Sequence, residues 1–345
     1  MFTGRLYKAV YDHENLNKAW NRVRTNKGVC GVDEMNVVRF NAMLFSGLMR
    51  LRDQLRKRSY QPKPIRRFNM KKSDGKNRPI GVLTVEDRIV QRAVLQVIEP
   101  LFDRHFSSSN FGYRKGLSTK DAIEQVVRNF NRNYQWVLDA DVLEFFQNID
   151  HRILIKKIRK VVSDSDILKL VEKWLDLGIM GFRSNSPVAG RPPKVGILQG
   201  SPLSPLFANI YLDPLDKALL KKGFKLVRFG DDFIVQCATR KEAEFALKYL
   251  LRLLENLKLE LHPYKTQLTH FDKGVKFLGN MLRSSFSSNG KTLRATSIKS
   301  QNNCKEARHV RALYDPSRVH FKNYGREIPG YAGAEETSGN TRNQG

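Results

Sequence analysis

The chain has 345 residues and is strongly basic, with 61 Lys and Arg against 34 Asp and Glu and a formal net charge of +27. Its 41% of hydrophobic residues suffice for a buried core in about two domains, and the charge makes nucleic acid the first candidate partner, ahead of a membrane. No apolar run approaches the ~18 residues of a transmembrane helix, the first residues lack the apolar segment of a signal peptide, and the three cysteines form no disulfide or zinc pattern, so we expect a cytoplasmic protein.

The first third of the chain is predicted to be mainly helical. Residues 14–60 carry apolar side chains at helical spacing. A basic stretch at 66–78 follows, and Ser73-Asp-Gly75 within it is a good hairpin turn. Thr84 to Leu101 again has a helical pattern, which we expect to end near Pro100.

Strands and helices alternate in the middle of the chain. Gln135 to Leu143 has a strand pattern, and Asn148 to Val162 a helical one with a cap near Asp150. Phe224 to Cys237 predicts two short strands around an acidic centre, and Lys241 to Leu257 an amphipathic helix. This alternation favours an α/β layer structure.

Three other segments have a composition that predicts their form. Residues 182–198 are rich in Pro, Gly and Ser and are expected to form a loop or hairpin. A short helix is predicted to begin at Ser204-Pro205. From Arg283 the chain is polar, and Ala334 to Gly345 are expected to be disordered.

Three acidic residues lie in apolar surroundings and form the candidate site. Asp141 follows an apolar strand, and Asp231 and Asp232 lie between two others. Adjacent carboxylates in such a place repel each other and resist desolvation, so a cation should compensate them. Two Mg²⁺ ions bound by carboxylates on neighbouring strands would suit in-line phosphoryl transfer. An isolated Asp-Asp pair is more often a solvated turn, and Asp139 shares its strand face with Asp141.

Several segments, in order along the chain, resemble the sequence blocks of reverse transcriptases, most closely those of the group II intron lineage. The resemblance runs from about Ala19 to Leu282, and each block alone is a weak motif, whereas all of them in order are specific. The blocks are Thr25–Asp33, Arg78–Gln91, Phe111–Gly116, Ala140–His151, Gln199–Tyr211, Phe229–Asp232, Leu259–Thr266 and Phe277–Gly279.

This resemblance implies roles for the acidic residues and their neighbours. Asp141 and Asp231 would hold two Mg²⁺ ions, Asp232 would support them, and the Val142 carbonyl would add a further ligand. Lys265 would protonate the leaving pyrophosphate. Taken alone, Lys265 could equally be a solvated lysine.

Further residues would bind the nucleotide according to the same resemblance. Lys72 and Arg78 match cations that grip the triphosphate, and Phe146 matches an aromatic residue that fills the space of a ribose 2′-OH. Gln199 and Gly200 would lie against template and nucleotide. Without the resemblance, Lys72 reads as an exposed basic residue and Phe146 as part of the core.

The last block and the departures from the family pattern complete the resemblance. Phe277-Leu-Gly279 is similar to the primer grip, which seats the primer end. Phe229 replaces the usual Tyr, for which we expect little catalytic effect. The region after Leu282 does not resemble a full thumb and maturase domain, and there is no cysteine-rich endonuclease domain, so a compact enzyme is implied.

The fold implied is a right-hand polymerase of the α/β (α+β) class, with a small antiparallel sheet backed by helices. We expect mainly fingers at 1–134, a palm at 135–282 with an interleaved fingers segment at about 151–196, and a short thumb-like region with a disordered tail at 283–345. The substrates would be an RNA template, a primer strand and deoxynucleoside triphosphates, together with a dedicated noncoding or intron RNA. Anti-phage defence and a retroelement role both stay open, as does the oligomeric state.

Two other functions compete with this one. Gly230-Asp-Asp232 is also a signature of RNA-dependent RNA polymerases, but Phe146 and Gln147 occupy the space where those enzymes tend to place an acidic residue. A non-catalytic splicing helper would use the fold only as an RNA-binding scaffold. The presence of every expected carboxylate argues against that helper.

Overall fold

The computed structural model describes residues 5–26, 28–71, 77–177, 194–287 and 290–297. The helices are α1 (Arg5–Val10), α2 (His13–Thr25), α3 (Val37–Ala42), α4 (Leu44–Arg56), α5 (Val85–Asp103), α6 (Thr119–Phe130), α7 (Phe145–Asn148), α8 (His151–Arg159), α9 (Ser165–Asp176), α10 (Ser204–Lys221) and α11 (Arg240–Asn256), with a 3₁₀ turn at Phe271–Lys273. The strands are β1 (Arg66–Lys71), β2 (Asn77–Val82), β3 (Trp136–Ala140), β4 (Lys225–Phe229), β5 (Asp232–Cys237), β6 (Gln267–His270), β7 (Val275–Phe277), β8 (Asn280–Ser287) and β9 (Gly290–Ser297).

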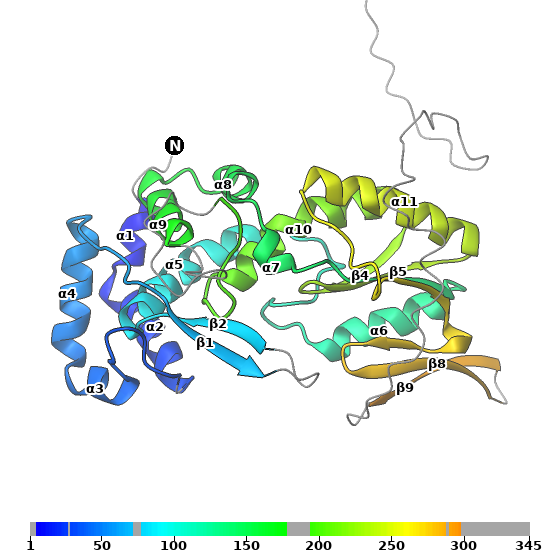
Figure 1. Cartoon of the computed structure of the whole chain (residues 1–345), viewed down its shortest axis with the longest axis horizontal. Coiled ribbons are helices and arrows are strands. Elements are labelled where there is room, and N and C mark those ends of the chain that lie inside the picture. Colours follow the sequence, from blue (N-terminus) through cyan, green and yellow to red (C-terminus); the bar gives the residue numbers. More distant parts are fainter. Residues whose placement is uncertain (1–4, 27, 72–76, 178–193, 288–289, 298–345) are drawn as a thin grey trace, which may run out of the picture.

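The molecule has a helical half and a half built on sheets. Figure 1 shows α1 to α5, α8 and α9 together with the β1–β2 hairpin on the left, and β3 to β9 with α6 and α11 on the right. Helix α10 lies between the two halves, and its buried side chains belong to the core cluster that also includes α2, α5, α9 and α11. The chain enters the helical half twice, because α8 and α9 come after β3.

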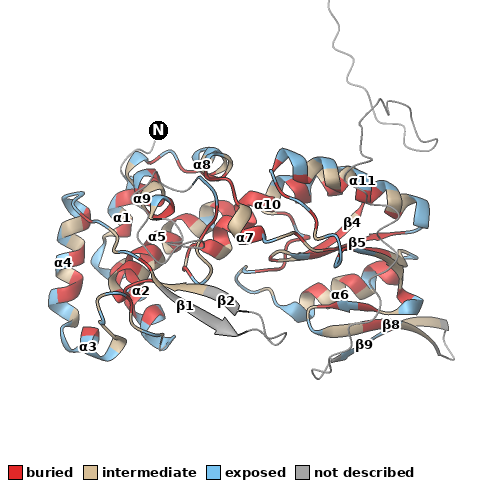
Figure 2. Cartoon of the chain, in the orientation of Figure 1, coloured by how far each residue is buried: buried red, intermediate tan, exposed pale blue. Residues whose placement is uncertain are grey.

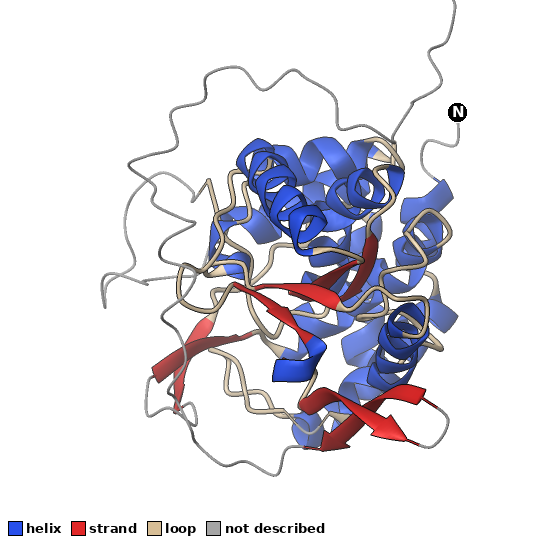
Figure 3. Cartoon of the chain, turned by 90° about the vertical axis from the view of Figure 1, so that its right-hand side faces the viewer, coloured by secondary structure: helices blue, strands red, loops and turns tan. Residues whose placement is uncertain are grey.

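The central sheet has the strand order β4-β5-β3-β6, and its described pairs are antiparallel. Helices α10 and α11 lie on one face and α6 on the other, as Figure 1 shows. In the turned view of Figure 3, helices lie on both sides of the central strands. Alternation along β3 explains this sandwich, since Leu138 and Ala140 join the core under α10 and α11 while Val137 joins the second core against α6. The expected antiparallel sheet backed by helices is confirmed.

A second sheet packs against α6 and lies below it in Figure 1. Strands β7, β8 and β9 pair in order, and their buried residues Val275, Phe277, Leu282 and Leu293 form a core with the apolar face of α6. Helix α6 begins with a capping box, in which the Ser118 side chain accepts from the backbone of the third residue and that residue's carboxylate reaches back. Strand β8 runs through residue 283, so the polar region that we expected to begin there starts inside a strand.

Several predicted elements are confirmed where local signals were strong. The β1–β2 hairpin pairs Lys71 with Asn77, although the predicted turn at 73–75 lies outside the described residues. Helix α8 is capped by Asp150, whose side chain accepts from the Ile153 amide at 3.0 Å. The amphipathic helix predicted from Lys241 to Leu257 is α11, which buries one face and exposes the other, as Figure 2 shows.

The helix predicted from Thr84 to Leu101 is confirmed with an end two residues later, and the helix predicted at Ser204 is longer than expected. Helix α5 passes through Pro100 and ends at Asp103. Helix α10 begins at Ser204 as predicted, but it is not short and spans 18 residues. The Ser204 hydroxyl donates to the Leu198 carbonyl at 2.5 Å. Helix α10 is buried around most of its surface, so its sequence lacks the one-sided periodicity from which helix length is usually predicted. The segment 182–198 is described only from 194, and the predicted disordered tail lies outside the described residues.

Candidate active site

The acidic residues meet where β3 and β5 lie side by side. Gly230 has a φ of +72° and turns the chain from β4 to β5, which explains the need for glycine there. Asp231 follows in the turn and Asp232 opens β5. Because Ala140 pairs with Phe233 in antiparallel register, the next residue of β3's segment, Asp141, lies beside Asp232. The three carboxylates predicted to act together are therefore brought together.

The site raises the pKa of two carboxyl groups, Asp232 and Asp139. Burial raises the pKa of Asp232 to about 6, with the charges of Asp231 and Asp141 adding to the shift and that of Lys265 opposing it. Asp139 lies on the same face, and burial together with Asp232 and Asp141 raises its pKa to about 7. A site with this much mutual repulsion favours the binding of a cation.

Lys265 supplies one positive charge at the site. Its Nζ lies 3.2 Å from Asp141 Oδ2, although the lysine side chain is 60% exposed. The backbone holds this contact in place, because the His262 amide donates to the Asp141 carbonyl at 2.7 Å. One residue further on, Val142 bridges Leu261 across the same pair of segments. The predicted proximity of Lys265 to the acidic residues is thus present.

The donor set fits Mg²⁺ as a shared ion rather than a fully enclosed one. Among the described residues no three His, Cys, Asp or Glu side chains form a complete metal cluster. Mg²⁺ is commonly bound by one or two carboxylates, with waters and substrate phosphates completing its octahedron. Asp141, Asp231 and Asp232 offer oxygen ligands of this kind.

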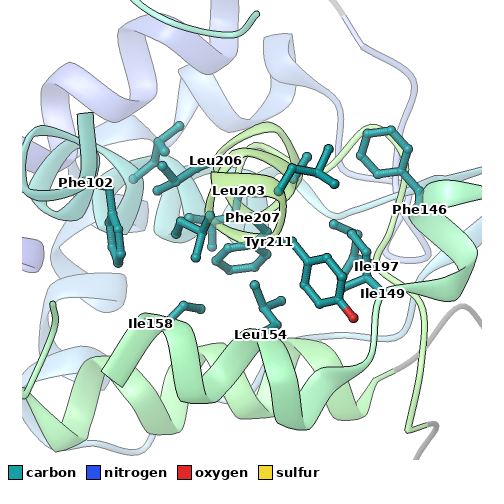
Figure 4. Packing of buried hydrophobic residues seen from close by; sticks show 14 of the residues in the cluster. Phe102, Phe146, Ile149, Leu154, Ile158, Ile197, Leu203, Leu206, Phe207 and Tyr211 are labelled. Carbon is teal, nitrogen blue, oxygen red and sulfur yellow. The ribbon is translucent and has the colours of Figure 1, made fainter. Parts of the chain in front are cut away.

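Phe146 is part of the hydrophobic core and only 8% exposed. It lies at the edge of the cluster beside Ile149 and Ile197, as Figure 4 shows, and its ring packs edge-on against Phe145 at 5.3 Å between centroids. The Phe146 carbonyl accepts from the Ile197 amide at 2.7 Å. Phe146 therefore packs in the core. If it also contacts the sugar of a bound nucleotide, it does so from the edge of this core.

The predicted template block lies next to the β1–β2 hairpin. Gly200 has a φ of +97°, and a Cβ on it would lie 3.6 Å from the Gly81 carbonyl and 3.7 Å from Ile80. A side chain at position 200 would have room within the protein, so the positive φ is the reason for a glycine there. Gln199 is half-buried. Lys72 lies outside the described residues, and Arg78 is placed only by its backbone in β2, opposite Met70.

The predicted primer grip is a tight hairpin turn between β7 and β8. Phe277 pairs with Asn280, and the two residues between them, Leu278 and Gly279, have φ values of +47° and +74°. Positive φ at both positions is typical of a type I′ turn. Phe277 is buried against α6, which anchors the turn to the sheet half.

Sequence reasoning missed Arg228, which lies in β4 next to the acidic turn. It is 0% exposed and forms an ion pair of 2.6 Å with Asp216 of α10, also 0% exposed. Gly112 was noted only as part of a block, yet it lies directly against the turn. A charged residue in the apolar run Leu226-Val-Arg-Phe229 was the available signal, since buried charges need a partner.

The described helices include none long and apolar enough to cross a bilayer. Residues 70–282 match the family model of reverse transcriptase (RNA-dependent DNA polymerase). Protein YkfC of Escherichia coli (strain K12) is 30% identical over 322 residues, covering 81% of this chain and 82% of that protein. Group II intron-encoded protein LtrA of Lactococcus lactis subsp. cremoris is 26% identical, covering 81% of this chain and 56% of its own length.

Among solved structures, the partial Cas6-RT-Cas1–Cas2 complex matches 73% of this chain and 42% of its own chain, with 26% identity and a TM-score of 0.42. The chain thus spans about half the length of LtrA and less of this complex. The family match covers more than half of the chain, and the Escherichia coli relative aligns over four fifths of both proteins. The chain belongs to the reverse transcriptase (RNA-dependent DNA polymerase) family.

Proposed function

We propose that the chain is itself an active RNA-directed DNA polymerase, which extends a primer 3′-OH on an RNA template with deoxynucleoside triphosphates. The observation that carries the proposal is the meeting of Asp141, Asp231 and Asp232 at one end of the central sheet, in a chain that matches the family from residue 70 to 282. The proposed site residues are the acidic triad, Lys265, and the nucleotide and primer residues named from the sequence.

The acidic triad and Lys265 would have different roles, metal binding and proton donation. Asp141 and Asp231 would hold two Mg²⁺ ions, with Asp232 in support and the Val142 carbonyl as a further ligand. When bound, the two ions would stabilise the attacking and leaving oxygens of an in-line displacement. Lys265 already lies 3.2 Å from Asp141, and its 60% exposed side chain can turn from that carboxylate toward the pyrophosphate and donate a proton to it.

The nucleotide would lie between the fingers and the sheet. Arg78 of β2 and Lys72, the residue that follows β1 in the sequence, would grip the triphosphate. Gln199 and Gly200 would line the template and nucleotide, and Phe146 would exclude the 2′-OH from the rim of the core. We propose fingers at 1–134 and about 151–196, with the palm over the rest of 135–282. Residues from 283 would form the thumb-like region.

Primer extension on an RNA template tests the reaction and its competitors together. Purified protein is given a primed RNA template, Mg²⁺, and either dGTP or GTP opposite a template C. The proposal predicts extension with dGTP and a strong preference for it over GTP. A preference for GTP would identify an RNA polymerase, and binding of the template with neither product would identify a non-catalytic helper.

We also propose a dedicated RNA partner. The net charge of +27 supports strong attraction to RNA, but charge alone typically gives dissociation constants of only about 10⁻⁴–10⁻⁶ M at physiological salt. A structured RNA offers shape and 2′-OH contacts in addition. Because LtrA is named as a group II intron-encoded protein, an intron-like RNA is the first candidate and a defence-associated noncoding RNA the second. Crosslinking and sequencing of RNA bound in the native host tests this, and RNAs recovered in proportion to their abundance would contradict it.

A further inference from the structure

A buried polar network lies directly behind the acidic turn. The Arg228 side chain donates from Nε and Nη2 to the two carboxylate oxygens of Asp216 at 2.7 and 2.6 Å. Its Nη1 donates to Asn209 Oδ1 at 3.0 Å and to the Gly230 carbonyl at 2.8 Å. Four of the five N–H groups of the guanidinium are thus engaged. We call Asp216, Asn209, Arg228 and the Gly230 carbonyl the arginine clamp.

The clamp also ties the turn to the loop before α6. The Arg228 amide donates to the Ser109 carbonyl, and the Arg228 carbonyl accepts from the Phe111 amide, both at 2.8 Å. Asn209 Nδ2 donates to the Gly112 carbonyl at 2.9 Å. A Cβ on Gly112 would lie 2.1 Å from the Gly230 nitrogen, so the backbones of the two segments are in direct contact.

We infer that Arg228 is a positioning residue for the reaction, holding the Gly230–Asp231 peptide so that Asp231 points into the site. The inference rests on the proposed function, in which Asp231 is a metal ligand. The side-chain partners of Arg228 are Asp216, Asn209 and the Gly230 carbonyl. Its Nη1 donates to that carbonyl, which belongs to the peptide that leads into Asp231. Gly230 lies in the left-handed region, where glycine is conformationally free. This hydrogen bond therefore restricts the turn together with the backbone contact to Gly112.

Stability alone does not account for a charge pair at this place. A fully buried ion pair is costly to desolvate, and its replacement by well-packed apolar residues is often neutral or stabilising. The neighbours of Arg228 along β4 are apolar, with Leu226 and Val227 in the cores on its two faces. What an apolar replacement cannot supply is the donor to Gly230.

This difference gives a direct test with the double variant Arg228→Met/Asp216→Leu in the full chain. If the clamp positions the turn, the variant stays folded and keeps its RNA affinity, although its melting temperature falls because Asn209 and Gly230 lose their donor. Its kcat for primer extension falls on the order of 10- to 100-fold, since small misplacements of catalytic groups have effects of that size. The Mg²⁺ concentration for half-maximal activity rises as well, because Asp231 is less well placed. Wild-type kcat and an unchanged Mg²⁺ midpoint in the folded variant would overturn the inference.

A control removes an Arg–Asp pair at the surface, where the Arg58 side chain is 65% exposed. Arg58 donates from Nε and Nη2 to Asp166 at 2.9 and 2.8 Å. This pair lies in the helical half and not in the half that contains the β4–β5 turn. The variant Arg58→Met/Asp166→Leu leaves the net charge unchanged, as the clamp variant does, and its kcat and Mg²⁺ midpoint should stay at the wild-type values. An equal loss of kcat in this control would show a general effect of such replacements and would refute the clamp.

A second variant decides the matter if the double replacement fails to fold. Arg228→Lys keeps the positive charge opposite Asp216 but loses the planar fork, so Asn209 and Gly230 cannot both keep their donor. It should fold and show the same kcat loss and raised Mg²⁺ midpoint, and wild-type values for both would overturn the inference. Asp231→Asn serves as reference: if it retains synthesis, the proposed function itself fails, whereas its inactivity beside a fully active clamp variant refutes the clamp alone.

Discussion

Asp139 is the residue whose replacement should change stability most clearly with pH. Burial and the neighbouring charges of Asp232 and Asp141 raise its pKa from 3.8 to about 7. The folded state therefore holds a proton that the unfolded state has released over this range. For a carboxyl group shifted in this direction, the free energy of unfolding falls as pH rises from about 4 to about 7 and is flat above that. At ~1.4 kcal/mol per pKa unit, the upper limit of the loss is about 4 kcal/mol.

Asp139→Asn removes this loss, since the amide does not ionise. We expect the variant to be more stable than wild type by about 2–4 kcal/mol at pH 8 and nearly equal to it at pH 4. Urea unfolding at pH 4, 5, 6, 7 and 8 without divalent ions measures the difference. Asp53→Asn, on the 53% exposed side chain of an α4 residue, is the control and should give no such trend. A stability difference that stays constant from pH 4 to pH 8 would refute the reasoning.

Four further outcomes follow from the site and its surroundings. Phe146→Val should raise GTP use relative to dGTP in single-nucleotide kinetics, and it is preferable to alanine, which would cost about 3–5 kcal/mol in this buried place; an unchanged ratio would leave Phe146 with its core role only. Lys265→Met should slow single-turnover extension by about 100-fold or more if it acts as a general acid, and a full rate would remove it from the mechanism. Gly279→Ala, at a φ of +74° with open space around the added Cβ, should cost about 1 kcal/mol of stability and raise the KM for primer more than it lowers kcat; the reverse pattern would argue against the primer grip. RNA affinity measured by filter binding should fall linearly on a log–log plot against salt, with a slope of about 0.7–0.9 per phosphate contact, whereas an affinity insensitive to salt would contradict a charge-driven interface.

Local signals in the sequence predicted those parts of the fold that are decided locally. The cap at Asp150 is such a case, because one side chain satisfies the first turn of α8. The strands on either side of Asp231 were also predicted, since a polar turn between two apolar runs leaves few other arrangements. Helix α10 was predicted too short because it is buried almost all round and shows little of the periodicity of a surface helix.

The residues of the candidate site were predicted from the order of the sequence blocks. The buried contacts that hold the acidic turn in place were not predicted. Arg228 finds Asp216 twelve residues away and on a helix, and Gly112 meets Gly230 from a distant segment. Such contacts depend on tertiary packing, which no local pattern encodes. The raised pKa of Asp139 has the same origin, because it depends on Asp232 of the neighbouring strand.

The central claim is that Asp141, Asp231 and Asp232 form the site of DNA synthesis. It is tested most directly by Mg²⁺-dependent extension of a primed RNA template with wild type, Asp231→Asn, Asp141→Asn and the control Asp53→Asn, each checked for its melting temperature. We expect synthesis by wild type and control, none by either site variant, and folded protein in all four, since loss of a repelling charge should not destabilise the site. Undiminished cDNA synthesis by folded Asp231→Asn or Asp141→Asn would contradict the account.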